Sequence, residues 1–161
     1  MGRYHPLLVA LHWLSAAMII LTLVSGGIAP LGFHLASGGL ILMVFLLRVA
    51  TKLKARVPPL EGPQAQIARV VHLSLYLLVF GVITSGIGLV IDANLLQVIQ
   101  GNATLPADFS ESAAYATHSL FTDLLLAAIA AHVIAAGWHQ FVRRDRIFSR
   151  MWFRKSGQLE F

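Results

Sequence analysis

The sequence predicts an all-α integral membrane protein, a four-helix bundle in which the N- and C-termini are both cytoplasmic. Three observations predict this fold class: 57% of the 161 residues are apolar, only 12% are charged, and the apolar residues gather in four long segments. An average soluble domain is about 25% charged, so this chain has too little charge to cover a water-soluble surface. Because a membrane-spanning helix needs about 20 residues, four spans use nearly the whole chain, residues 1–161, as a single domain.

The predicted spans cover about residues 7–28, 31–51, 70–91 and 113–138. Turn-forming residues separate them: Ser25-Gly26-Gly27 and Pro30, then Pro58-Pro59, then Gly101-Asn102 and Pro106. A secretory signal has an apolar core of only about 7–15 residues. The first apolar segment is longer than such a core, so we expect it to be retained as a span.

The basic residues indicate how the bundle is oriented. All twelve lysines and arginines lie before the first span, around the second connection, or after the fourth span: Arg3, Arg48, Lys52, Lys54, Arg56, Arg69, Arg143, Arg144, Arg146, Arg150, Arg154 and Lys155. With four spans these regions share one side, which the positive-inside rule makes cytoplasmic. The long third connection carries acids instead and is expected on the periplasmic side. Orientation thus explains the net charge of +5, and the sequence predicts lipid contacts and no nucleic-acid partner.

Five of the seven histidines fall inside the apolar segments: His12, His34, His72, His118 and His132. A histidine within a span is costly and by default indicates a functional site. The chain has no cysteine, which excludes disulfides, thiolate metal sites and iron–sulfur clusters. The histidines are therefore the strongest candidate metal ligands in the sequence.

The depth of these histidines is informative. His118 and His132 are 14 residues apart on the fourth span, so they lie about 21 Å apart along the helix and only about 40° apart around it. His34 shares the periplasmic level with His118, whereas His12 and His72 share the cytoplasmic level with His132. Two levels favour two bis-histidine haems, whose saturated iron suits electron transfer. Zinc or copper is the alternative, although such ions would favour ligands clustered at one depth.

The histidines stand in stretches that together resemble the bacterial cytochrome b561 family. The matching stretches run over nearly the whole chain: Leu11-His12-Trp13-Leu14, Phe33-His34-Leu35-Ala36-Ser37-Gly38, Leu46-Leu47-Arg48, Pro58-Pro59, His72-Leu73-Ser74-Leu75-Tyr76-Leu77-Leu78, Thr117-His118-Ser119-Leu120, Ala131-His132-Val133, Trp138-His139-Gln140 and Arg150-Met151. That family comprises four-helix, di-haem b membrane proteins related to the cytochrome b subunits of nickel–iron hydrogenase and formate dehydrogenase. The resemblance implies two haem b groups and a multi-pass location in the bacterial inner (cytoplasmic) membrane.

The resemblance also implies the ligands of the haem iron. It pairs His12 with His132 and His34 with His118, which agrees with the depths of these residues in the spans. His72 matches a recurrent histidine of the family and is the alternative cytoplasmic ligand. It could instead contact a haem propionate or a quinone.

The function that the resemblance implies is electron transfer across the bilayer between a periplasmic donor and membrane ubiquinone. Some members oxidise superoxide, so the activity of a superoxide:ubiquinone oxidoreductase follows as the candidate enzyme activity. However, the predicted periplasmic loops contain Asp92, Asp108 and Glu111 but no lysine or arginine, and steering of anionic superoxide requires positive charge. The alternatives are a haem-bearing anchor subunit of a periplasmic hydrogenase or dehydrogenase, and a non-haem metal-binding membrane transporter.

His139 is the candidate quinone contact. It follows His132 by seven residues, which places it on nearly the same helix face and about 10 Å nearer the cytoplasm. There a histidine can hydrogen-bond a quinone carbonyl and pass a proton, with Arg69 and His72 completing the pocket. A simple contact with lipid headgroups is the alternative for His139. Arg48 and Arg69 are alternative partners of haem propionates.

Two further features accompany the histidines. Asp123 is the only carboxylate well inside a span, and it lies about 140° around the helix from His118, so we do not expect it to face the same haem. Glycines within the second and third spans leave room for a flat macrocycle or for close helix packing: Gly38, Gly39, Gly81, Gly86 and Gly88.

Overall fold

The computed structural model describes residues 5–54, 63–109, 111–145, 148 and 151. Within these ranges the fold is all-helical and has no strand. The elements are α1 (Pro6–Ile28), α2 (Leu31–Lys54), α3 (Pro63–Asp92), the short α4 (Leu95–Ile99), α5 (Ala113–Gly137) and one π-helical turn, η1 (Trp138–Val142). Several predicted features lie outside the described residues: Arg3, Arg56, Pro58-Pro59, Arg146, Arg150, Arg154 and Lys155.

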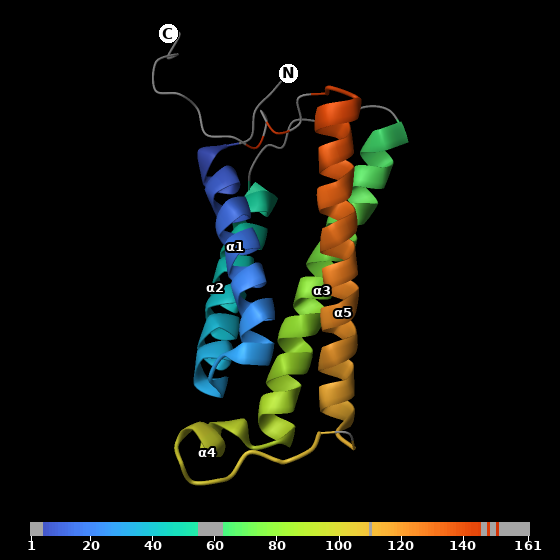
Figure 1. Cartoon of the computed structure of the whole chain (residues 1–161). Coiled ribbons are helices and arrows are strands. Elements are labelled where there is room, and N and C mark those ends of the chain that lie inside the picture. Colours follow the sequence, from blue (N-terminus) through green and yellow to red (C-terminus); the bar gives the residue numbers. More distant parts are fainter. Residues whose placement is uncertain (1–4, 55–62, 110, 146–147, 149–150, 152–161) are drawn as a thin grey trace.

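Four helices are long and apolar enough to cross a membrane, over Pro6–Gly26, Leu31–Lys54, Gln66–Asp92 and Ala113–Val142. The predicted all-α fold with four membrane spans is therefore confirmed. Figure 1 shows that the start of α1, the end of α2, the start of α3 and the end of α5 lie at one end of the bundle, whereas α4 lies at the other. The cytoplasmic side of the termini stays a prediction.

The helix starts follow from local side chains. Pro6 occupies the first turn of α1, where its missing N–H is no loss, and the His5 ring accepts a hydrogen bond from the Leu7 N–H at 3.2 Å. At the start of α5, the Ser112 hydroxyl accepts from the Tyr115 N–H at 3.1 Å and donates to the Asp92 carboxylate at 2.9 Å. Ser112 thus caps α5 and ties it to the end of α3.

One predicted turn and one predicted helix start are wrong, whereas the first span ends at Ile28 as predicted. Ser25-Gly26 was expected in the first turn, but both residues lie within α1, and only Ala29 and Pro30 separate α1 from α2. Serine and glycine did not break the helix because Ser25 bonds back to it, its hydroxyl donating to the Thr22 carbonyl at 2.9 Å. The third helix begins at Pro63, seven residues before the expected start.

Packing is concentrated within two helical hairpins, one formed by α1 and α2 and the other by α3 and α5. Few large apolar side chains are buried between the helices, and many, such as Met43 and Ile134, are exposed. This is the pattern of helices that face lipid. Inside the second hairpin the helices approach closely, because a Cβ on Gly81 would lie 2.5 Å from Phe121 Cδ1. The packing explanation therefore holds for Gly81.

Candidate functional site

The structure brings four of the predicted histidines together as two pairs. The rings of His34 on α2 and His118 on α5 have centroids 6.4 Å apart. The rings of His12 on α1 and His132 on α5 are also 6.4 Å apart. Each pair joins one helix of the first hairpin to α5 of the second, so each pair bridges the two hairpins.

The ring separations fit a metal ion held between two imidazoles. Imidazole–metal bonds are about 2 Å long, so an ion bonded to two opposed rings requires centroids about 6 Å apart. Both the His34–His118 and the His12–His132 pairs have this separation. The rings of His72 and His132 are only 5.4 Å apart, which is shorter than such an ion requires.

His34 is held on its own hairpin by two neighbouring residues of α1. The Ser25 hydroxyl lies 3.2 Å from His34 Nδ1 and itself donates to the Thr22 carbonyl. Because its one proton is used there, the hydroxyl accepts from a protonated Nδ1, which leaves the Nε2 lone pair free for a metal. A Cβ on Gly26 would lie 3.2 Å from His34 Cε1, so the glycine provides the space for the ring.

His118 is held in the same manner by α3. Its Nδ1 lies 3.2 Å from both the Ser85 hydroxyl and the Val82 carbonyl. A carbonyl only accepts, so Nδ1 carries the proton and Nε2 is again free. A Cβ on Gly86 would lie 3.1 Å from His118 Cε1. Hence a Ser-Gly dipeptide on the neighbouring helix orients each ring of this pair.

The sequence prediction missed the role of these serines. The dipeptide occurs as Ser25-Gly26 and Ser85-Gly86, but also as Ser37-Gly38 and Ser156-Gly157, so the sequence alone does not single out the two copies that contact histidines. Partners that orient metal-ligating histidines typically affect metal affinity about 10- to 100-fold.

On the sequence prediction that His34 and His118 hold a haem, replacing Gly86 by valine is expected to weaken its binding by about 10- to 100-fold, because the added carbons push the His118 ring away from its position. Titration of the haem-free protein with haem, followed by its absorbance, measures this affinity. The matched control is Gly88→Val on the same helix, where an added Cβ meets nothing within 4 Å. Equal haem affinity in the two variants would contradict this role of Gly86.

The other level, formed by His12, His72 and His132, is arranged differently. His72 Nδ1 donates to the Ala68 carbonyl at 2.6 Å, so its Nε2 is free. His12 Nδ1 lies 2.8 Å from the Arg48 guanidinium, which can only donate. A neutral His12 that binds metal through Nε2 carries its proton on Nδ1, and Arg48 must then turn to another acceptor.

Two cations lie together at this level, one of them, Arg48, beside His12. The Arg48 guanidinium and the Lys52 ammonium both lie over the Tyr76 ring, at 5.6 and 4.3 Å from its centroid. Such charges suit an anionic group, for example a carboxylate. Lys52 was not singled out from the sequence, although its position one turn after Arg48 was the signal. Arg69, by contrast, has an exposed side chain one turn before His72.

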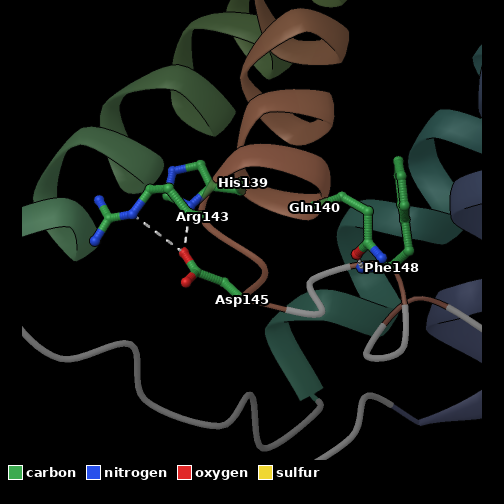
Figure 2. A network of polar contacts seen from close by, with 5 residues as sticks. All are labelled: His139, Gln140, Arg143, Asp145 and Phe148. Atoms are coloured by element: carbon green, nitrogen blue, oxygen red, sulfur yellow. Dashed lines mark hydrogen bonds and ion pairs between the residues drawn. The ribbon is translucent and has the colours of Figure 1, made fainter.

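His139 lies in the π-helical turn at the end of α5, and Figure 2 shows its ring directed at the Asp145 carboxylate. His139 Nδ1 lies 2.7 Å from Asp145 Oδ2, and Arg143 Nε lies 3.6 Å from the same oxygen. Asp145 was not singled out from the sequence. The signal was an acid six residues after the histidine, in an otherwise basic stretch.

The remaining predicted residues lie apart from the histidine pairs. The Asp123 side chain is exposed on α5, and we find no evidence that it joins either pair. A Cβ on Gly38, Gly39 or Gly88 would meet nothing within 4 Å. Within the described ranges, no group of three or more histidine, aspartate or glutamate residues could hold a metal ion, so the cluster expected for zinc or copper is not found there.

Comparison with known proteins identifies the family of the chain. A model of the prokaryotic cytochrome b561 family matches residues 3–154, which is nearly the whole chain. Searches of the curated proteins and of the solved structures found no match. The four apolar helices that face lipid and this family match together show that the chain belongs to the prokaryotic cytochrome b561 family, as a multi-pass membrane protein that binds haem b and transfers electrons.

Proposed function

We propose that the chain holds two haem b groups, one at each level, and passes electrons across the bilayer from a periplasmic donor to membrane ubiquinone. The observation that carries this proposal is the pair of equal ring separations, 6.4 Å for both His34–His118 and His12–His132. The two α5 histidines lie about 21 Å apart along the helix, so the two sites belong to opposite leaflets.

The ligand assignment rests on the ring separations of both pairs and, for His34 and His118, also on their free Nε2 atoms. His34 and His118 bind the periplasmic haem, and His12 and His132 bind the cytoplasmic one. Bound haem would supply one-electron chemistry there, and iron held by two histidines would favour electron transfer over oxygen binding. His72 is the alternative cytoplasmic ligand, but its 5.4 Å separation from His132 favours His12.

Arg48 has two partners in this proposal. In the structure the Arg48 guanidinium lies 2.8 Å from His12 Nδ1. A His12 that binds metal through Nε2 carries a proton on Nδ1, and this proton repels the guanidinium. Arg48 then turns to a haem propionate beside it, together with Lys52. A charge-assisted pair of this kind is stronger than an ordinary hydrogen bond, so the propionate compensates for the contact that Arg48 gives up.

The orientation follows from charge. The end of the bundle that carries the end of α2 and the end of α5 has the basic residues Arg48, Lys52, Lys54, Arg143 and Arg144, whereas residues 93–112 at the α4 end include no lysine or arginine. The positive-inside rule therefore makes the α4 end periplasmic, in the bacterial inner membrane. The absence of positive charge in residues 93–112 favours a donor other than superoxide.

The quinone site lies at the cytoplasmic end, around His139. This residue is about 10 Å beyond His132 along the helix, close to both the cytoplasmic haem level and water. His72 and Arg69 on α3 are the other candidates for contact with the quinone. Reduction to quinol consumes two electrons and two protons, so two donor turnovers are needed for each quinol.

The direct test is anaerobic reduction of the purified protein followed by addition of a short-chain ubiquinone. The proposal predicts that the reduced b-type absorbance bands are lost as quinol forms. A protein that carries haem but is not reoxidised by ubiquinone would overturn the quinone assignment. Co-purification with a periplasmic hydrogenase or dehydrogenase would favour the anchor-subunit function instead.

Replacing His139 by alanine is expected to leave the haem content unchanged and to slow reoxidation by ubiquinone about 100-fold, the usual scale for loss of a general acid. Stopped-flow absorbance of the pre-reduced protein measures this rate. His5→Ala, which removes another histidine from the same end of the bundle, is the matched control. If both variants are reoxidised as fast as the wild type, His139 is not at the quinone site.

A further inference from the structure

The end of α5 carries a carboxylate–imidazole pair, Asp145 and His139. Two bonds join these residues: His139 Nδ1 lies 2.7 Å from Asp145 Oδ2, and the Asp145 backbone N–H donates to the His139 carbonyl at 3.0 Å. The pair is thus closed by a side-chain bond and a backbone bond between the same two residues. Figure 2 shows the ring of His139 and the side chain of Arg143 approaching the same carboxylate.

An unusual local backbone builds this pair. The last turn of the helix is π-helical over Trp138–Val142, and the Arg143 N–H donates to the Trp138 carbonyl at 3.1 Å. Arg144 then adopts a left-handed φ of 56°, a conformation that residues with a Cβ seldom adopt. The chain reverses there and returns Asp145 to His139. Single π-helical turns occur frequently at functional sites.

The carboxylate determines which ring nitrogen of His139 exchanges protons. An ionised carboxylate only accepts hydrogen bonds, so Nδ1 of His139 is the donor and keeps its proton. Proton exchange therefore takes place at Nε2. The negative charge of Asp145 orients the ring and compensates the positive charge of its protonated form, as the carboxylate does in a catalytic triad.

The position of the pair suits proton transfer between water and the membrane interior. The side chains of His139 and Asp145 are 25% and 36% exposed, so both groups are partly reached by water and partly covered. His139 is also on the helix that carries His132, about 10 Å nearer the cytoplasm. Arg143 Nε, 3.6 Å from Asp145 Oδ2, is a weaker and more exposed neighbour of the carboxylate.

We propose that Asp145 and His139 form a dyad that delivers protons for ubiquinone reduction, an inference that rests on the proposed function. His139 donates its Nε2 proton to a quinone oxygen as electrons arrive from the haem chain. The N–H bond breaks, the O–H bond forms, and a proton from cytoplasmic water restores the ring. Two electrons and two such protons convert the quinone to the quinol. Asp145 acts as a positioning residue, through His139.

Three substitutions of Asp145 separate its charge from its size. Asp145→Asn keeps an oxygen acceptor but removes the charge, Asp145→Ala removes both, and Asp145→Glu keeps the charge. The dyad predicts that Asp145→Asn and Asp145→Ala lower kcat for ubiquinone reduction about tenfold, with KM nearly unchanged and a larger solvent deuterium isotope effect. Asp145→Glu should recover part of kcat. Arg144→Gln, which removes a neighbouring charge outside the pair, is the matched control.

The outcomes distinguish the dyad from the proposed function. A wild-type kcat and isotope effect in Asp145→Asn, in protein that does reduce ubiquinone, would overturn the dyad alone. If Asp145→Ala lowers kcat but Asp145→Asn keeps the wild-type kcat, then Asp145 only supports the local structure through its hydrogen bond. This result would also overturn the dyad. Wild-type protein with full haem that fails to react with ubiquinone would overturn the proposed function and the dyad together. Haem content and thermal stability are measured for every variant.

Discussion

Protein in which His118 is replaced by alanine is expected to lose the periplasmic haem and to keep the cytoplasmic one. In the proposed assignment each haem would be held by one histidine of α5 and one of the first hairpin. Removal of the α5 histidine would therefore offer the iron a single imidazole and remove the bridge between the hairpins. The haem content, measured as the pyridine haemochrome and divided by the protein concentration, should fall from about two equivalents to about one.

The reciprocal variant His132→Ala should also keep about one haem, in this case the periplasmic one. The two variants should therefore differ in the absorbance maximum and midpoint potential of the haem that remains, because the surroundings of the two sites differ. His5→Ala, with a histidine removed outside both pairs, should keep both haems. Two full equivalents in either His118→Ala or His132→Ala would show that the ligands are assigned wrongly.

The second large effect is expected at the cytoplasmic level, where His12 and His72 compete for the same role. His12→Ala should lose the cytoplasmic haem completely, whereas His72→Ala should retain both haems. The reason is the distance between ring centroids. The His12 and His132 rings are 6.4 Å apart, whereas the His72 and His132 rings are 5.4 Å apart. A metal ion between two imidazoles needs about 6 Å. Haem content and low-temperature spectra of the two variants give the answer.

The opposite result would reassign the ligand. If His72→Ala loses the haem and His12→Ala retains it, then His72, His132 and the intervening iron form the cytoplasmic site, and Arg48 keeps its contact with His12. Arg48→Gln helps to separate these cases. With His12 as ligand, this variant should keep the haem iron low-spin and shift its midpoint potential, because the propionate loses a cation.

The sequence alone was sufficient to predict the four spans and the two levels of histidines. Spans depend on the length and apolarity of one segment, and the levels depend on the helical rise between His118 and His132. Neither property needs knowledge of how the helices pack. The orientation derived from the charge distribution along the chain stays a prediction.

What the sequence could not provide are contacts that depend on how one helix is rotated against another. The Ser85 hydroxyl reaches a histidine 33 residues away, and Arg48 reaches one 36 residues away. These contacts follow from the packing of α3 against α5 and of α2 against α1. Ser25-Gly26 was assigned to a turn because these residue types are typical of turns, whereas within the hairpin they hold the ring of His34.

The pair formed by Asp145 and His139 was missed for a different reason. The two residues are six positions apart in the chain, a spacing that a regular helix would place about 120° apart around its axis. The π-helical turn and the left-handed backbone at Arg144 bring them together. Such backbone irregularities are not visible in hydrophobic periodicity, which is the main signal of secondary structure in a sequence.

The most direct test of the central claim is the number of haem b groups bound by each chain of the purified, haem-replete protein. Two histidine pairs with equal separations predict about two haems per chain, which titrate as two components in a redox titration. A single haem, or a protein without haem, would contradict the proposal of two electron-transfer sites across the bilayer.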